Sequence, residues 1–314
     1  SAVYAVALAP DEAPWMASGD DRGKIILWNQ RSGKKVRQYD AHNGGVSKLL
    51  FLPGGQQFIS TSFNGDVKIW SVEGAEPVQV LPYQMHSIED AVLSADGRFL
   101  LTGNAGGEGQ LWRISDISQP AVTFQVPQST GIRAVAISPN GTTGYAGDLS
   151  GQVSAWDLSD GTMQSAWPLG REGYIEKLFY LNNRLIALCN RDDGASKLWD
   201  VMDTQPLKNL SEAHGGHTLD IAISLDQQYL LSGSVDKTIN QWTTTDWALK
   251  QRFKGHAHQV EALTIATDGF MFLARNQDGT HRLWDFGSGK ITEALNEKQH
   301  AQTFGPEEGT LLYG

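Results

Sequence analysis

Residues 24–28 read KIILW, a short strand-like segment closed by tryptophan, and six similar segments follow it along the chain. The tryptophans that close them are Trp28, Trp70, Trp112, Trp156, Trp199, Trp242 and Trp284, at successive spacings of 42, 42, 44, 43, 43 and 42 residues. A period in the low forties, with an aliphatic strand ending each unit, is typical of the blades of a β-propeller. The spacing therefore predicts an all-β chain built from seven repeats.

Three of these segments continue as Trp-Asp, at Trp156-Asp157, Trp199-Asp200 and Trp284-Asp285. In this dipeptide and in the spacing, almost the whole chain resembles the WD40 repeat family. The resemblance implies one domain over residues 1–298, a seven-bladed WD40-type β-propeller of four-stranded antiparallel blades. It also implies a platform whose loops select its partners, since the fold alone does not determine function.

The second repeat shows the strands that we expect in each blade. Its apolar runs cover residues 46–52, 57–62, 66–70 and 77–81, and the turns Pro53-Gly54-Gly55 and Asn64-Gly65 separate the first three. Short apolar runs bounded by Gly, Asp, Asn and Pro indicate strands joined by tight turns. No segment of the chain has a convincing helical period.

The composition narrows the classes of partner. No apolar run approaches the roughly 20 residues of a membrane-spanning helix, so no membrane insertion is predicted. The net charge of −10 disfavours nucleic acid, which requires a basic surface. Basic residues do gather in the first repeat, where we expect a solvated rim; a local dock for an acidic partner is the alternative. These residues are Lys24, Arg31, Lys34, Lys35 and Arg37.

The chain has one cysteine, Cys189, in the second strand expected for the fifth repeat. One cysteine forms neither an intrachain disulfide nor a thiolate metal cluster. We expect Cys189 to be a small buried residue and not a nucleophile.

The WD40 resemblance implies a buried hydrogen-bond network within a blade. Its members are a His 28 residues before the Trp, a Ser or Thr 10 before it and an Asp 6 before it, as in His214, Ser232, Asp236 and Trp242. A complete buried network satisfies its polar groups and rigidifies the blade. The other predicted members are His42, Ser60 and Trp70, then Asp193 and Trp199, and finally His256, Asp278 and Trp284. Asn64 stands at the Asp position of the second repeat, and Ala274 at the Ser position of the seventh.

His, Ser and Asp are also the residue types that form the catalytic triad of a serine hydrolase. Here each of them falls at a position set by the repeat, and the set recurs partially in other repeats, whereas an active site is normally built once. The sequence therefore predicts no catalytic residues. No cofactor is expected either.

Two further histidines, His217 and His258, precede inner strands of neighbouring repeats, and Asp220 follows the first of them. Imidazoles paired with a carboxylate suit a transition metal, although closed sites usually supply four ligands. Two spare histidines on surface loops more often bind nothing. The sequence therefore favours no metal site.

The favoured hypothesis is a non-catalytic scaffold that binds a protein or peptide around the central channel. Contacts would come from the connections that lead into the inner strands and from the turns between second and third strands. Arg171 and Arg191 are expected to clamp an acidic group bidentately, and Phe63 and Tyr174 to provide apolar anchoring. The full set is Asp21, Arg22, Asn43, Phe63, His86, Arg171, Tyr174, Arg191, Asp192, His217 and His258.

Residues 299–314 are left over after the seventh repeat, and two interpretations stay open. The segment aligns with the first two strands of an eighth repeat. Its end, GPEEGTLLYG, also resembles the helix that leads into the haem motif of small c-type cytochromes, although the chain contains no Cys-x-x-Cys-His. In either case we expect a part of a longer polypeptide or complex.

Two rival functions follow from these alternatives. One is the propeller module of a WD40–cytochrome fusion in periplasmic electron transfer, and the other is a propeller that binds a metal or small molecule. The compartment stays open between the cytoplasm, typical of the family, and the periplasm of the fusion.

Overall fold

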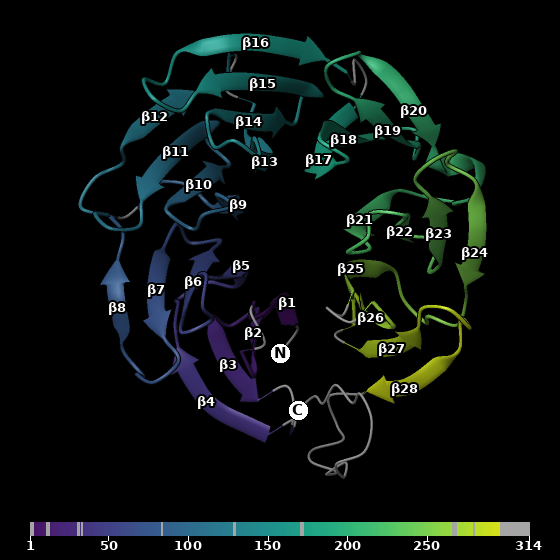
Figure 1. Cartoon of the computed structure of the whole chain (residues 1–314), viewed down its shortest axis with the longest axis horizontal. Helices are drawn as coiled ribbons and strands as arrows, with labels where there is room; N and C mark the ends of the chain where they lie inside the picture. The colour runs from purple at the N-terminus through teal and green to yellow at the C-terminus, as the bar shows by residue number, and fades with distance from the viewer. Residues whose placement is uncertain are drawn as a thin grey trace. The chain divides into compact units, whose positions relative to one another are not determined.

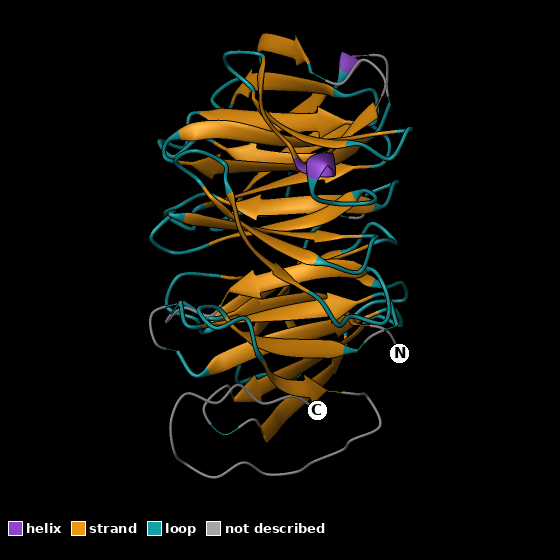
Figure 2. Cartoon of the chain, turned by 90° about the vertical axis from the view of Figure 1, so that its right-hand side faces the viewer, coloured by secondary structure: helices purple, strands orange, loops and turns teal. Residues whose placement is uncertain are grey.

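The computed structural model describes residues 3–10, 13–29, 32, 34–82, 84–127, 130–169, 173–265, 269–278 and 280–295. Its strands form seven four-stranded sheets, each built from strands consecutive in the sequence (Figure 1). This architecture is a seven-bladed β-propeller, as the repeat predicts. Strands and loops dominate (Figure 2), and the 3₁₀ helix η2 (Leu210–Glu212) is a single short turn. The tail at 299–314 lies outside the described residues.

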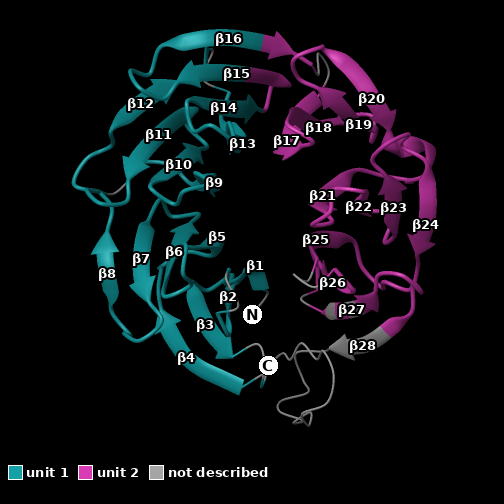
Figure 3. Ribbon diagram, in the orientation of Figure 1, with its two compact units in different colours: residues 1–148, 154–166, 299–314 teal, residues 149–153, 167–298 magenta. Residues whose placement is uncertain are grey.

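The described chain divides into two compact units (Figure 3). Residues 1–148 and 154–166 belong to the first unit, and residues 149–153 and 167–298 to the second. The first three sheets lie in the first unit, the last three lie in the second, and residues of the fourth sheet are divided between them. Among the described residues, no helix has the length and apolar character required to cross a membrane.

The strands of the first four sheets are as follows. The first sheet has β1 (Val3–Leu8), β2 (Trp15–Asp20), β3 (Lys24–Asn29) and β4 (Lys34–Asp40), and the second has β5 (Val46–Phe51), β6 (Gln57–Ser62), β7 (Val67–Ser71) and β8 (Pro77–Val80). The third has β9 (Ile88–Leu93), β10 (Phe99–Asn104), β11 (Glu108–Arg113) and β12 (Val122–Gln125), and the fourth has β13 (Ile132–Ile137), β14 (Thr143–Asp148), β15 (Gln152–Asp157) and β16 (Met163–Pro168).

The last three sheets repeat the arrangement. The fifth has β17 (Gly173–Leu181), β18 (Arg184–Arg191), β19 (Ser196–Asp200) and β20 (Gln205–Asn209). The sixth has β21 (Thr218–Ile223), β22 (Tyr229–Ser234), β23 (Ile239–Thr243) and β24 (Leu249–Phe253), and the seventh has β25 (Val260–Ile265), β26 (Met271–Asn276), β27 (His281–Asp285) and β28 (Ile291–Leu295).

The hydrophobic core within each unit lies between successive sheets. In the first unit, Tyr39 of β4 packs against Phe58 and Trp70 of the second sheet. A glycine at the end of a second strand lets the next sheet approach closely: a Cβ on Gly19 would lie 2.6 Å from Val46, and one on Gly233 would lie 2.8 Å from Val260. Both glycines therefore accommodate the first residue of the following inner strand.

Each inner strand pairs with its neighbour through a shifted register near its start. The shift in β1 falls between Val3 and Ala5, so Tyr4 is the extra residue, and the shift in β5 leaves Ser47 extra in the same way. A β-bulge leaves its extra residue out of the ladder and re-aims its side chain. The repeated bulge presents one residue per blade at the same end of the strand, a feature that the sequence did not predict.

A carboxylate links three consecutive inner strands in each unit. Lys48 Nζ lies 2.6 Å from Asp90 Oδ1, and Asp90 Oδ2 accepts a 3.0 Å hydrogen bond from the backbone N of Val135. In the second unit, Asp220 pairs with Lys177 in the same way and accepts from the backbone N of Leu263 at 2.8 Å. These half-buried charges are paired and hydrogen-bonded, so they hold neighbouring blades in register at low desolvation cost.

Candidate functional site

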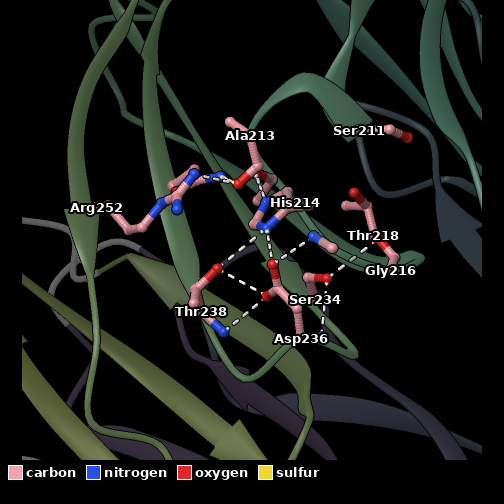
Figure 4. A network of polar contacts seen from close by, with 12 residues as sticks. Ser211, Ala213, His214, Gly216, Thr218, Ser234, Asp236, Thr238 and Arg252 are labelled. Atoms are coloured by element: carbon pink, nitrogen blue, oxygen red, sulfur yellow. Dashed lines mark hydrogen bonds and ion pairs between the residues drawn. The ribbon is translucent and has the colours of Figure 1, made fainter.

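The sixth sheet contains a compact polar network built around His214 (Figure 4). His214 Nε2 lies 2.7 Å from Ser232 Oγ, and Trp242 Nε1 donates to the same Oγ at 2.8 Å. On the other side of the ring, Nδ1 lies 3.3 Å from Asp236 Oδ2 and 3.1 Å from Thr238 Oγ1. One serine hydroxyl therefore connects a buried histidine to a buried tryptophan.

The carboxylate of Asp236 is held in its charged form by this network. Burial alone would raise its pKa, but hydrogen bonds from His214, from the backbone N of Gly215 and from Thr238 hold the pKa below its usual range. The backbone N of Gly215 donates at 2.7 Å and that of Thr238 at 2.9 Å. Asp236 thus orients the histidine and closes the β22–β23 turn.

The second sheet has the same histidine, serine and tryptophan contacts, but its carboxylate comes from a different position in the repeat. His42 Nε2 lies 2.7 Å from Ser60 Oγ, which accepts from Trp70 Nε1 at 2.8 Å. The carboxylate that faces His42 Nδ1, at 3.6 Å, belongs to Asp66 and not to the position that Asn64 occupies. Asn64 donates to Asp66 at 3.0 Å, so it supports the acid.

In the seventh sheet the network is incomplete, because Ala274 replaces the serine. His256 Nδ1 lies 2.7 Å from Asn276 Oδ1. His256 Nε2 and Trp284 Nε1 are buried, and neither has a hydrogen-bond partner among the described residues. Asp278 is exposed and faces His258 (3.3 Å), not His256.

In the fifth sheet the structure differs from the predicted buried network. Asp193 is exposed and lies 3.4 Å from Arg191 Nη2, and Trp199 is only half-buried. The buried polar contact uses other side chains: Ser196 Oγ donates to Asn190 Oδ1 at 2.6 Å, and Asn190 Nδ2 donates to the carbonyl of Thr218 at 2.9 Å. Counting six residues back from Trp199 selects Asp193, but this aspartate lies in a surface turn and not in the buried network.

Cys189 is buried in β18, as predicted, and burial raises the pKa of its thiol to about 12. Since the thiolate is the reactive species, we expect iodoacetamide at pH 8 to label native Cys189 at least about a hundredfold more slowly than the urea-unfolded chain. Mass spectrometry of timed aliquots measures both rates. Equal rates would show that the site opens freely to solvent.

The loops at one end of the sheets are joined in a repeated way. The first residue after β6, Phe63, donates its backbone N–H to the carbonyl of Gly45 at 3.0 Å, and Ala105 donates to Ser87 at 2.9 Å in the next sheet. In the second unit, Val235 donates to His217 at 3.0 Å. Each bond ties a turn between second and third strands to the connection that leads into its own inner strand.

In the first unit this end carries five of the predicted contact residues. Asp21, Arg22, Asn43, Phe63 and His86 are all exposed. The Phe63 ring lies edge-on to Tyr4, with ring centroids 5.9 Å apart. The His86 ring packs against the backbone of Gly106, because a Cβ on Gly106 would lie only 2.2 Å from His86 Cδ2.

Sequence reasoning missed two residues at this end, Tyr4 and Met85. Tyr4 is 42% exposed because the bulge in β1 places it outside the ladder, and Met85 is 83% exposed in the connection before β9. A large apolar residue in the connection three residues before an inner strand was the available signal for Met85. The bulge leaves no such signal in the sequence.

In the second unit the structure brings three predicted residues together. The rings of Tyr174 and His217 meet edge-on at 6.2 Å, and His217 Nε2 lies 2.6 Å from the carbonyl of Arg191. Asp192 is exposed beside them, and His258 lies apart, against Asp278. Arg171 lies outside the described residues, so its pairing with Arg191 stays a prediction.

The histidines weighed as metal ligands are engaged separately. His217 faces a carbonyl, His258 faces Asp278, and Asp220 is held by Lys177 and the backbone of Leu263. In the part of the chain that the structure describes, no three His, Cys, Asp or Glu side chains gather as metal ligands would.

Comparison with known proteins agrees with this repeat geometry. The family model described as WD domain, G-beta repeat, matches residues 33–71, 204–243 and 247–285. The chain carries WD40 repeats. Each matched segment begins with the outer strand of one blade and runs through the first three strands of the next, as β4–β7, β20–β23 and β24–β27. These next blades are the second, sixth and seventh, in which a histidine of the WD40 network is present.

Several curated proteins are similar to this chain. The target of rapamycin complex subunit wat1 of Schizosaccharomyces pombe is 21% identical over 238 residues, which cover 74% of each protein. Pre-mRNA-processing factor 19 of Bos taurus is 25% identical over 77% of this chain and 48% of its own length. A guanine nucleotide-binding protein subunit beta of Arabidopsis thaliana is 32% identical over 50% of this chain and 45% of its own. Apart from wat1, the chain spans about half or less of these relatives.

Proposed function

We propose that this WD40 chain is a non-catalytic scaffold that binds a protein or peptide through the loop end of its first unit. The observation that carries the proposal is a set of exposed apolar and aromatic side chains there, Tyr4, Phe63, Met85 and His86, which we call the loop strip. Aromatic residues and methionine are enriched in protein interfaces. Apolar side chains gathered at one end of the sheets indicate an interaction site more strongly than scattered ones.

Glycines bring the loops that carry the strip into close contact with one another. A Cβ on Gly65 would lie 2.2 Å from the carbonyl O of Gln84, and Gly44 and Gly45 form the connection before β5. With no side chain at Gly65, the β6–β7 turn packs directly against the connection that carries Met85 and His86, so the strip is continuous across the two sheets. One of the similar proteins, wat1, is by name a subunit of a complex. This similarity supports a protein partner for the present chain.

The His, Ser and Asp side chains support a structural role, not hydrolysis. His214 and Ser232 are buried, and their polar atoms are used by Trp242 and by the β22–β23 turn. A nucleophile that a substrate cannot reach has no catalytic use. We place the main contact on the first unit because Arg191, expected to clamp an acidic group, already faces Asp193.

Variants of the loop strip test the proposal by affinity capture. We expect Phe63→Ser with Met85→Ser to reduce the recovered partner at least about tenfold, since central apolar anchors dominate interface energies. Val78→Ser, which removes an exposed apolar side chain from the outer strand β8 of the same unit, is the matched control and should leave recovery unchanged. Equal loss in both variants, or none in the first, would contradict the proposal.

A further inference from the structure

We propose that the notch between Tyr4 and Phe63 receives a side-chain cation, the guanidinium or ammonium of an Arg or Lys on the protein partner. This inference rests on the proposed function and specifies the chemistry of its partner. Three features of the notch carry it: two partly exposed aromatic rings, the glycine backbone of Gly45 beside them, and the exposed carboxylate of Asp21.

The two rings are both partly exposed to solvent, where a cation can reach them. Their centroids are 5.9 Å apart with an interplanar angle of 81°, and Tyr4 and Phe63 remain 42% and 43% exposed. A cation over a ring face within about 6 Å of the centroid is attracted by the ring quadrupole. At this separation, one cation placed beside the pair can contact both rings.

Glycine at position 45 lets Tyr4 and Asp21 lie close to each other beside the notch. A Cβ on Gly45 would lie 3.3 Å from Tyr4 Cδ2 and 3.3 Å from the Cα and carbonyl O of Asp21. Tyr4 and Asp21 therefore border the same small space, and Phe63 is tied to it through its hydrogen bond to the Gly45 carbonyl. A residue larger than glycine at position 45 would push Tyr4 and Asp21 apart.

Asp21 supplies an exposed carboxylate beside the turn that Asp20 closes. Its neighbour Asp20 accepts from the backbone N of Arg22 at 3.0 Å and of Lys24 at 2.8 Å, so Asp20 closes the β2–β3 turn. Asp21 is exposed, and neither an ion pair nor a hydrogen bond joins its side chain to a described residue. The net charge of −10 also favours the approach of a basic partner over an acidic one.

The second unit has a similar ring pair that lacks these features. Tyr174 and His217 also meet edge-on, but His217 is held by the carbonyl of Arg191. This pair serves as an internal comparison for the notch in the first unit.

Four capped tripeptides, Ac-Gly-Xaa-Gly-amide with Xaa as Arg, Lys, citrulline or Glu, test the notch on the full chain. Chemical shifts of the Tyr4 and Phe63 ring protons report binding site-specifically. We expect Arg and Lys to bind in the millimolar range, and citrulline, which keeps the shape of Arg without its charge, at least about fivefold more weakly. Asp21→Asn should weaken the Arg peptide by a similar factor, and Arg22→Ala should not weaken it.

Equal binding of citrulline and Arg, or tighter binding of the Glu peptide with loss in Arg22→Ala, would overturn the inference. So would unchanged binding of the Arg peptide in Phe63→Ser. Affinity capture tests the scaffold proposal and the cation proposal separately. If Phe63→Ser with Met85→Ser abolishes partner recovery while Asp21→Asn retains it, the scaffold proposal stands and the cation proposal is rejected.

Discussion

Replacing Ser232 by alanine is expected to lower the free energy of unfolding by about 3 kcal/mol, because the change strands two buried polar groups at once. Ser232 Oγ lies 2.7 Å from His214 Nε2 and accepts from Trp242 Nε1 at 2.8 Å. The shift in urea midpoint at constant slope measures the effect. Ser165→Ala, which changes an exposed serine on β16, is the matched control and should stay within about 0.5 kcal/mol of the parent.

The seventh blade allows the reverse experiment. Ala274 occupies the place of Ser232, and His256 Nε2 and Trp284 Nε1 are buried without a described partner. Ala274→Ser should supply the missing hydroxyl and raise the free energy of unfolding by about 1–2 kcal/mol. If Ser232→Ala were neutral, or Ala274→Ser destabilising, the hydroxyl would not be the link between histidine and tryptophan that the geometry indicates.

Stability is expected to fall steeply as the pH drops from 6.5 to 4. Burial lowers the pKa of His42 to about 4, helped by the charge of Lys68, and burial likewise lowers the pKa of His256 to about 4. Both histidines are neutral when folded and regain a pKa near 6.5 when unfolded, so in this window the unfolded chain binds more protons. Each histidine then costs up to about 3 kcal/mol of stability at pH 4.

Urea unfolding at several pH values measures this dependence. His256→Gln should remove about half of it, since glutamine does not titrate and Gln84 occupies the corresponding buried position in the third repeat. His258→Asn, which replaces an exposed histidine of the neighbouring connection, is the matched variant. Stability that is constant between pH 6.5 and 4 would contradict buried neutral histidines.

Most of the fold was predictable because each blade repeats the same local pattern. The tryptophan spacing located the strands, and the second-repeat estimate of 46–52 differs from β5 by one residue at its end. The turn signals succeeded for the same reason: Gly54, Gly55 and Gly65 all have positive φ angles, which glycine adopts without strain.

The candidate site was less predictable, because it depends on geometry that a fixed spacing does not encode. Counting six residues back from the tryptophan selected Asn64 and Asp193, whereas the structure uses Asp66 in the second blade and leaves Asp193 in a surface turn. The exposure of Tyr4 depends on a bulge in β1, and a bulge shifts register without changing the composition of the strand.

The central claim, that the loop strip of the first unit is the binding surface, is tested most directly by site-specific photo-crosslinking. A photoreactive amino acid replaces Met85 in the strip or, as a matched position, Val78 on β8 of the same unit, and the chain is irradiated with its partners present. We predict one discrete crosslinked protein from position 85 and none from position 78. Crosslinks of equal yield from both positions, or from position 78 alone, would contradict the account.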